Sequence, residues 1–368
     1  MRKEKACGLF LVLSIFSACC CPVGNSAGAV SISLFSIKGA LSSANSASIC
    51  SFEIAYPVRT TTNASEIEIR NVLEDKTERV GFGESFCSNP ALSGSRLAFQ
   101  ANSGGSPKIV LFDRTTTSLL VVSEAGESSY SPVMKGNHLC WTFTKKSEIG
   151  QGIRLFGLSD GKSVVLKNSD QSRIMSGPVI NSLGVFWSQF FENGFAVFKY
   201  DFLTSTTQPL CKSSSVISGL SADGNILAYS KRPQNGFPVT GCIDGTGKVV
   251  VLDDVWSDKS DPSVSGTCVV WSVKKDGASE IKVWNGSTNI LANVKSAQCT
   301  PCVSEGNVVW HDQSGDGGSD IFGAEISGGG VFRVTSGGGN KVLPRISGQV
   351  CIWLGGTDEG FDGAIITP

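Results

Sequence analysis

The 368-residue sequence predicts an all-β fold, a β-propeller in which four-stranded blades form a ring. Three observations lead to this prediction: an aromatic residue recurs about every 42 residues, a proline recurs nine residues before it, and a glycine five residues before it. Repeats of this length with signals for four short strands are typical of propeller blades. Residues 30–368 hold eight such units. We therefore expect eight blades, with seven blades and one divergent unit as the alternative.

The recurring aromatic residue ends a short apolar stretch in every unit. The apolar residues of this stretch are consecutive and do not alternate with polar ones, which is typical of a strand buried on both faces. We predict that this stretch is the second strand of each blade. The eight aromatic residues are Tyr56, Phe99, Trp141, Trp187, Tyr229, Trp271, Trp310 and Trp353.

The proline and glycine columns define the first strand and its turn. Proline precedes the aromatic residue by nine positions in six of the eight units, as Pro262 does. We expect it to open the first strand, where a missing N–H is tolerated. Glycine precedes the aromatic residue by five positions in five units, as Gly266 does. Glycine tolerates positive φ and so marks a hairpin turn. After a polar loop, a third and a fourth strand follow, for example over Ile109–Phe112 and Leu119–Val122.

The last unit has room for three strands only, because just 15 residues follow Trp353. The segment Val30–Ile37 is strand-like and precedes the first complete unit. We predict that it supplies the outer strand of the last blade. Such a strand closes the ring and covers an edge that would otherwise promote aggregation.

The N-terminus has the pattern of an export signal. A positively charged stretch precedes the apolar run Ala6–Phe16, which is too short to span a bilayer. Two cleavage patterns compete: an A-x-A site that would make Val30 the first residue, and a lipobox-like sequence that would place a lipid on Cys19.

We assign residues 1–29 to a signal peptide and residues 30–368 to a single propeller domain. The protein is expected to be exported, to the periplasm, the cell surface or the medium. A lipid on Cys19 would be its one link to a membrane.

The repeat resembles that of a known family. The segments Pro262–Trp271 (PSVSGTCVVW) and Pro344–Trp353 (PRISGQVCIW) resemble the TolB-like propeller repeats of exported bacterial and archaeal proteins. Leu220–Ser230 resembles the related Ser-Pro-Asp-Gly form of this repeat, with Ala222 in place of proline. The resemblance covers essentially Val30–Pro368. It implies a propeller fold and carries little information about function.

Composition excludes several classes of function. Lys and Arg total 31 against 32 for Asp and Glu, and the resulting net charge of −1 argues against a nucleic-acid partner. The chain has only two histidines, His138 and His311, so a His-rich zinc site is excluded. The sequence contains no G-x-S-x-G, P-loop or G-x-G-x-x-G motif in the required context. A binding scaffold is therefore favoured over an enzyme, and an enzyme acting on a glycan at the loop face is the alternative.

Charged residues gather where the second strand of a unit meets the third. The loops that join these strands lie on one face of a propeller, and binding is usually a property of such loops. We interpret the charges as a docking face for a protein or an anionic polymer, with solubility as the alternative explanation. Units 1, 3, 5 and 6 contribute the cations Arg59, Lys145, Lys146, Lys231, Arg232, Lys274 and Lys275, and units 7 and 8 contribute the acids Asp312, Asp316, Asp320, Asp358, Glu359 and Asp362.

The loop after Trp310 has the pattern D-x-S-x-D-G-x-x-D. It is close to the first nine positions of an EF-hand loop, in which alternate oxygen ligands surround one Ca²⁺ ion. The Glu that an EF-hand has at its twelfth position is replaced by Gly323. A weak calcium site is one interpretation, and a capped hairpin turn is the other. No other cofactor is expected. The residues of this calcium site would be Asp312, Ser314, Asp316 and Asp320.

Nine of the 13 cysteines follow the leader. Cys140, Cys268 and Cys351 fall in predicted second strands, where we expect them to act as small apolar residues. Cys299 and Cys302 form a C-x-x-C pair, which indicates a local disulfide or free thiols because no second such pair completes a zinc site.

Overall fold

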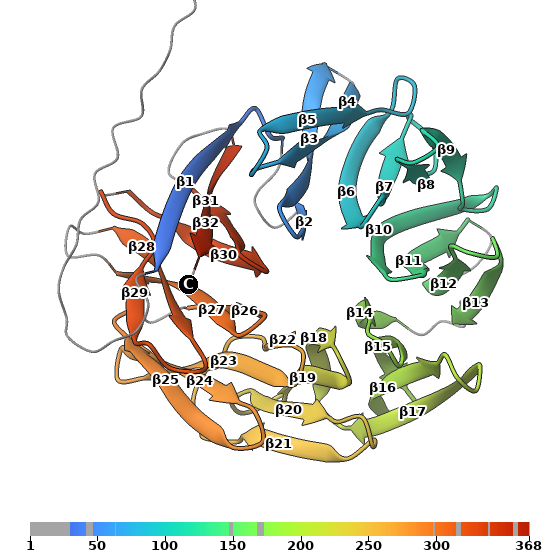
Figure 1. Cartoon of the computed structure of the whole chain (residues 1–368). Helices are drawn as coiled ribbons and strands as arrows, with labels where there is room; N and C mark the ends of the chain where they lie inside the picture. The colour runs from blue at the N-terminus through green and yellow to red at the C-terminus, as the bar shows by residue number, and fades with distance from the viewer. Residues whose placement is uncertain are drawn as a thin grey trace, which may run out of the picture.

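The computed structural model describes residues 30–367, apart from 42–46, 63, 147–149, 168–172, 297–298, 314–317, 338 and 356–359. Across these residues the chain forms 32 β-strands and no helix. Figure 1 shows the strands arranged as a ring of sheets. The fold is therefore the all-β propeller that the sequence predicts.

No helix long and apolar enough to cross a membrane is found in the described part of the chain. The leader, with both cleavage sites, lies outside the described residues. Export and lipidation of Cys19 therefore stay predictions.

Each of blades 1 to 4 consists of four consecutive antiparallel strands, and the first of them lies nearest the centre of the ring (Figure 1). They are blade 1, β2 (Ser48–Cys50), β3 (Glu53–Thr61), β4 (Ala64–Asn71) and β5 (Lys76–Val80); blade 2, β6 (Phe86–Ser93), β7 (Arg96–Asn102), β8 (Lys108–Asp113) and β9 (Ser118–Val121); blade 3, β10 (Glu127–Lys135), β11 (His138–Lys145), β12 (Gly152–Gly157) and β13 (Ser163–Lys167); and blade 4, β14 (Ile174–Ile180), β15 (Gly184–Phe191), β16 (Gly194–Asp201) and β17 (Thr206–Ser213).

Blades 5 to 7 follow the same plan, and blade 8 takes its outer strand from the start of the chain. They are blade 5, β18 (Val216–Asp223), β19 (Ile226–Arg232), β20 (Val239–Ile243) and β21 (Val249–Asp253); blade 6, β22 (Ser263–Ser265), β23 (Cys268–Lys275), β24 (Ala278–Trp284) and β25 (Thr288–Val294); blade 7, β26 (Cys302–Ser304), β27 (Asn307–Gln313), β28 (Ser319–Glu325) and β29 (Val331–Arg333); and blade 8, β30 (Val342–Ser347), β31 (Val350–Leu354), β32 (Gly360–Thr367) and β1 (Ser31–Lys38).

Strand β1 closes the ring as predicted. It pairs antiparallel with β32 over its whole length, from Ser31 opposite Thr367 to Lys38 opposite Gly360. The last blade thus joins the two ends of the chain, and its outer strand precedes blade 1 in sequence.

Hydrogen bonding joins the described strands into seven sheets, which agree with eight blades. One sheet has eight strands because a single parallel bridge, between Ser65 and Phe86, connects blades 1 and 2. The hydrophobic core gives the same count. Eight clusters of buried side chains are found among the described residues, one between each pair of neighbouring blades. The cluster between blades 8 and 1 contains Ile37, Tyr56 and Phe361.

The aromatic column forms the inter-blade core. All eight predicted aromatic residues lie in the second strand of their blade, and none is more than 6% exposed. The hairpin glycines also behave as expected. Gly266, for example, has φ +59°, in the left-handed region that favours glycine. Three units lack this glycine, and in two of them the residue in its place, Ser51 or Glu305, adopts a similar positive φ.

The proline column differs in part from the expectation. Pro262 and Pro301 directly precede the short first strands of blades 6 and 7. In blades 2, 3, 4 and 8, by contrast, the proline lies within the first strand, at a break in register such as that between Ser88 and Ala91 around Pro90. At a bulge, the residue is left out of the hydrogen-bond ladder and its N–H has no partner on the neighbouring strand. Proline, which lacks this N–H, is therefore tolerated inside these inner edge strands.

Serines link neighbouring blades around the centre of the ring. In six places, a backbone N–H of one first strand, or of the turn directly after it, donates a hydrogen bond to a serine Oγ about one repeat earlier in the chain, on the blade before. The pairs are Leu92 with Ser48 (2.9 Å), Leu220 with Ser176 (3.3 Å), Val264 with Ser221 (3.1 Å), Val303 with Ser263 (3.2 Å), Glu305 with Ser265 (3.0 Å) and Gly348 with Ser304 (2.8 Å).

Candidate functional site

The predicted cations lie on one face of the ring. They occupy the last residues of second strands, or the turn directly after them, in blades 1, 3, 5 and 6. Second strands all run in the same direction through their blades, so these ends share a face, which we call the loop face. The residues are Arg59 on β3, Lys145 and Lys146 on or just after β11, Lys231 and Arg232 on β19, and Lys274 and Lys275 on β23.

Four of these seven cations come from adjacent blades. Blades 5 and 6 are neighbours, and Arg232 and Lys274 line the same cavity between them. Arg59 belongs to blade 1, and the Lys145–Lys146 pair to blade 3. The structure therefore divides the predicted basic arc into one close group and two separate positions (Figure 1).

Ion pairing distinguishes the members of the close group. Arg232 pairs with Asp261 at 2.9 Å, and Lys275 pairs with Glu280 at 2.8 Å. Lys274 is exposed and has no ion-pair partner among the described residues. It is thus the cation of this group that is best placed to meet a ligand.

The cavity has a volume of about 390 Å³, within the usual range of roughly 300–1,000 Å³ for ligand sites. Blades 5 and 6 and the connections that follow each of them contribute to it. Its walls are polar, with hydroxyl groups and charges of both signs. The lining residues are Arg232, Asp258, Lys259, Ser260, Ser272, Lys274, Ser279, Cys299 and Thr300.

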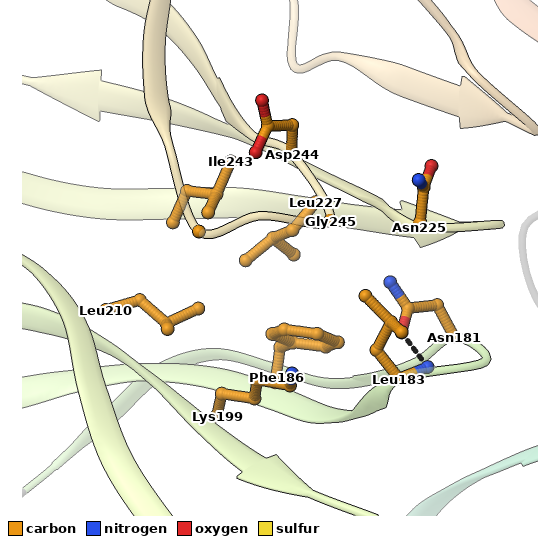
Figure 2. A pocket seen from close by; sticks show the side chains of 11 residues that line it. Asn181, Leu183, Phe186, Lys199, Leu210, Asn225, Leu227, Ile243, Asp244 and Gly245 are labelled. Carbon is orange, nitrogen blue, oxygen red and sulfur yellow. Dashed lines mark hydrogen bonds between the residues drawn. The ribbon is translucent and has the colours of Figure 1, made fainter.

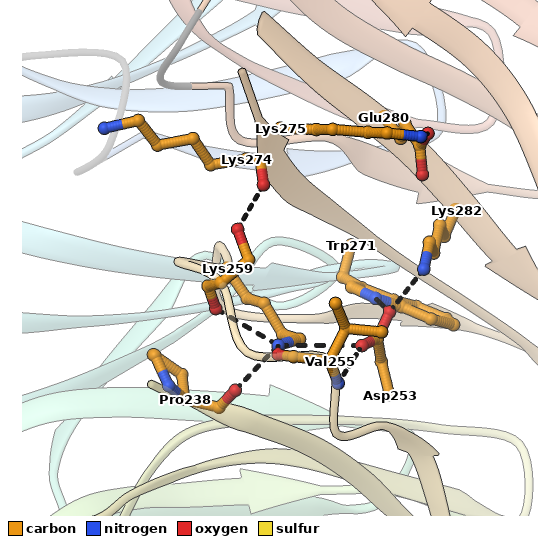
Figure 3. A network of polar contacts seen from close by, with 10 residues as sticks. Pro238, Asp253, Val255, Lys259, Trp271, Lys274, Lys275, Glu280 and Lys282 are labelled. Carbon is orange, nitrogen blue, oxygen red and sulfur yellow. Dashed lines mark hydrogen bonds and ion pairs between the residues drawn. The ribbon is translucent and has the colours of Figure 1, made fainter. Parts of the chain in front are cut away.

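One wall of the cavity is the connection between blades 5 and 6, residues 254–262. Figure 3 shows the polar network at its base. The Nζ of Lys259 donates to the carbonyl oxygens of Pro238 (2.9 Å), Ser257 (3.1 Å) and Val255. It also lies 3.6 Å from Oδ1 of Asp253. The lysine thus joins two backbone segments, the connection itself and the start of β20, at one buried point.

Asp253 is the second centre of this network. Its Oδ2 accepts from Nζ of Lys282 at 2.7 Å and from Nε1 of Trp271 at 3.3 Å. Burial by itself would raise the pKa of Asp253, but the hydrogen bonds from Lys282 and from the N–H of Val255, together with the charges of Lys282 and Lys259, outweigh burial and lower it. Burial lowers the pKa of Lys259, and the charge of Asp253 opposes that shift. The side chains of Asp253 and Lys259 are at most 1% exposed, which marks them as structural supports.

The connection then runs along the end of β23. The N–H of Ser260 donates to the carbonyl of Ser272 at 3.0 Å, and the N–H of Lys274 donates to the carbonyl of Asp258 at 2.8 Å. These bonds extend the sheet by a short segment. The segment is therefore held in place, and the residues just before it are presented in a fixed position.

Trp256 is the residue that this arrangement presents. It is 80% exposed and lies two residues before Asp258 on the same connection. Its ring meets the edge of Phe237, from the second-to-third-strand loop of blade 5, with centroids 5.8 Å apart at 69°. Sequence reasoning missed both aromatics. The available signal was that Trp256 stands outside the aromatic column, within a polar stretch between two repeats.

The predicted calcium residues are only partly described. Ser314 and Asp316 lie outside the described residues. Oδ1 of Asp312 accepts from the N–H groups of Ser296 and Gln313, each at 2.7 Å. No group of three or more metal-ligating side chains occurs among the residues that the structure describes. The calcium site stays a prediction.

Asp320, the last of the predicted calcium ligands, is buried in β28 and has cationic partners. It accepts hydrogen bonds from Arg333, from Nζ of Lys341 at 3.0 Å and from the hydroxyl of Thr335 at 2.8 Å. Burial would raise its pKa, but these bonds outweigh burial and lower it. Asp320 is thus a buried ion-pair centre and not part of an exposed acidic arc. Of the other acids predicted there, Asp358 and Glu359 are outside the described residues.

The nine cysteines of the described chain are free thiols. Cys140 and Cys351 are buried in second strands as predicted, whereas Cys268 is half-buried. Burial raises the pKa of the Cys299 thiol, and the C-x-x-C pair holds no disulfide. A high pKa disfavours the reactive thiolate, so the buried Cys299 acts in packing.

Other cavities are less suited to a ligand. The cavity of Figure 2, between blades 4 and 5 on the face opposite the loop face, has a volume of only about 30 Å³, roughly the space of one water. It is lined mainly by apolar side chains, such as Phe186 and Leu227. A cavity of about 430 Å³ lies at the inner strands of blades 1, 2, 3 and 8, where Arg345 donates to the carbonyl of Ala47. It includes none of the predicted binding residues.

No family model matches the sequence. No curated protein matches it either. Solved structures match the fold. The β-propeller domain of the Trilobed protease from Pyrococcus furiosus aligns with a TM-score of 0.55 at 15% identity, over 79% of this chain and 97% of that domain. An oligogalacturonate lyase in complex with manganese aligns at 0.53 and 11% identity, over 86% of this chain and 96% of that one.

The acylaminoacyl peptidase from Pyrococcus horikoshii aligns at 0.53 and 13% identity over 83% of this chain. The chain spans about 56% of the length of that peptidase. TolB from Acinetobacter baumannii aligns at 0.40 and 18% identity, over 67% of this chain and 65% of that one, a similarity too low to carry an argument. At these identities the matches establish a β-propeller and do not extend to function.

Proposed function

We propose that the protein is an exported β-propeller scaffold that binds an anionic partner, an acidic protein or an anionic polymer, on its loop face. One observation carries this proposal. Blades 5 and 6 bring four predicted cations to adjacent strand ends, beside a polar cavity that Arg232 and Lys274 both line. Of the four, Lys231 and Lys274 have no ion-pair partner among the described residues.

The chemistry of these groups suits recognition of negative charge. Arg232 uses one guanidinium nitrogen for Asp261, which leaves further N–H donors for a carboxylate or sulfate. Exposed cations also steer an anionic partner toward this face and increase its association rate. Such an interaction weakens with salt, because exposed charges are screened beyond about 8 Å at physiological ionic strength.

The alternative of an enzyme acting on a glycan has less support. Glycoside hydrolysis generally requires two carboxyl groups on either side of the bond to be cleaved. Asp258 is the one carboxyl group among the described residues that line the cavity.

Binding to dextran sulfate tests the proposal, measured by fluorescence anisotropy at increasing NaCl. We expect binding that weakens steeply with salt. Replacing Lys231, Arg232, Lys274 and Lys275 by Gln together should weaken it and flatten its salt dependence. The control carries Lys76→Gln, Lys162→Gln and Lys248→Gln, in third-to-fourth-strand hairpins on the opposite face. Equal loss in both variants, or equal binding by both, would contradict the proposal.

A further inference from the structure

The cavity of the loop face and the exposed Trp256 together have the composition of a saccharide site. We propose that they bind an acidic saccharide, whose carboxylate is held by Lys274 and Arg232 and whose ring packs against Trp256. This inference rests on the proposed function, since it names the ligand class of the same face.

The first support is the cavity lining. Apolar pockets with a few polar groups are the usual sites of apolar ligands and of peptide side chains. Here four of the nine lining residues are hydroxylated, namely Ser260, Ser272, Ser279 and Thr300. The hydroxyls of Ser279 and Thr300 have no hydrogen-bond partner in the part of the chain that the structure describes. A ligand rich in hydroxyl groups can satisfy such a surface, whereas an apolar side chain cannot.

The second support is the exposure of Trp256. A side chain as large as tryptophan normally buries most of its surface, and it contributes to binding by offering a rigid apolar face. Trp256 is 80% exposed, although the backbone that follows it is held by Lys259 and by the end of β23. The position is therefore fixed mainly by the backbone, and the contact with Phe237 leaves most of the ring exposed. The apolar C–H face of a pyranose is a suitable partner for it.

The third support is charge. Lys274 has no ion-pair partner among the described residues, and Arg232 keeps unused donors beside Asp261. Both line the cavity that Asp258 also lines. A neutral saccharide would leave Lys274 without an anionic partner and the remaining donors of Arg232 without a charged acceptor. A uronate supplies a carboxylate for them, and its hydroxyl groups can donate to Asp258.

Isothermal titration calorimetry of the full chain tests the inference, with a tetramer of β-1,4-linked glucuronate and the matching glucose tetramer as probes. We expect the uronate to bind at least about tenfold more tightly than the glucose tetramer, because hydrogen bonds to charged groups are the stronger ones. Lys274→Gln should remove most of this preference. Trp256→Ala should weaken the binding of both tetramers at least about tenfold and keep the preference for the uronate. These two variants thus separate the role of charge from that of stacking.

Matched controls are available on the same scaffold. Phe190, on the second strand of blade 4, is exposed and does not line the cavity, so Phe190→Ala should leave the affinity unchanged. Lys248→Gln, on the opposite face, should do the same. An unchanged melting temperature (Tm) of each variant excludes unfolding as the cause of lost binding.

Three results would overturn the inference: no preference for the uronate, full binding by Trp256→Ala, or tighter, Trp256-dependent binding of a six-residue aspartate peptide. In the last case the site would be one for an acidic protein. Dextran sulfate binding separates this outcome from failure of the proposed function. If dextran sulfate still binds through the loop face, the scaffold proposal stands and only the saccharide assignment falls.

Discussion

Closure of the ring by β1 makes a prediction that one side chain can test. Ile37 is 1% exposed and packs in the cluster that joins blade 8 to blade 1, with Ile54, Tyr56 and Phe361. Ile37→Ala leaves a cavity at this junction, and large-to-small changes of this kind cost about 2–5 kcal/mol. Leu34 lies three residues earlier on the same strand and is 64% exposed. Leu34→Ala should change the free energy of unfolding by less than about 0.5 kcal/mol.

The assay is urea unfolding followed by tryptophan fluorescence, with the wild type and both variants at equal concentration. We expect Ile37→Ala to lower the free energy of unfolding by at least about 2 kcal/mol relative to Leu34→Ala. A chain that lacks residues 30–38 should also expose the edge of β32 and form oligomers in size-exclusion chromatography, because an unpaired strand edge pairs with other chains. Equal stability of the two point variants, or a shortened chain that stays monomeric and equally stable, would refute closure by β1.

Three further predictions concern acid, calcium and export. The hydrogen bonds of Asp320 with Arg333 and Lys341 lower its pKa, so their contribution to the free energy of unfolding is present above about pH 4 and is lost as pH falls through the lowered pKa. In urea titrations, Asp320→Asn should lower the free energy of unfolding by about 3 kcal/mol at pH 7 and by much less at pH 2. An equal loss at the two pH values would exclude the ion pair. Calcium at millimolar concentration should bind the predicted loop and raise the Tm of the wild type. Mg²⁺ should not raise it, and calcium should not raise the Tm of Asp316→Ala. If calcium leaves the Tm of the wild type unchanged, Asp312 only caps a turn. Intact mass of the exported protein should correspond to a chain that begins at Val30, and a diacylglycerol-modified Cys19 would favour the lipobox instead.

Much of the fold was predictable because each blade repeats the same physical requirements. An aromatic residue fills the space between two blades, and a left-handed turn needs Gly266 or its equivalents. The recurrence of these residues located both the second strands and the hairpins. The bulge around Pro90 was not predictable, because its break in register depends on pairing with the neighbouring strand.

The site was predictable only in its charges. Their spacing from the aromatic column placed Arg232 and Lys274 on the loop face. The cavity and the position of Trp256 depend on a connection that does not repeat, held by a buried contact between Lys259 and Asp253. No periodic signal marks such a contact. Burial of Asp320 was missed for a related reason, since its partners lie 13 and 21 residues away.

The central claim, that the loop face of blades 5 and 6 binds an anionic ligand, is tested most directly by lysine protection. The folded protein is acetylated with and without dextran sulfate, and the modification of each lysine is measured by mass spectrometry. We predict that Lys231 and Lys274 are protected by the polymer, while Lys162 and Lys248 on the opposite face are modified to the same extent in both samples. Equal protection of all four lysines, or protection confined to Lys162 and Lys248, would contradict the claim.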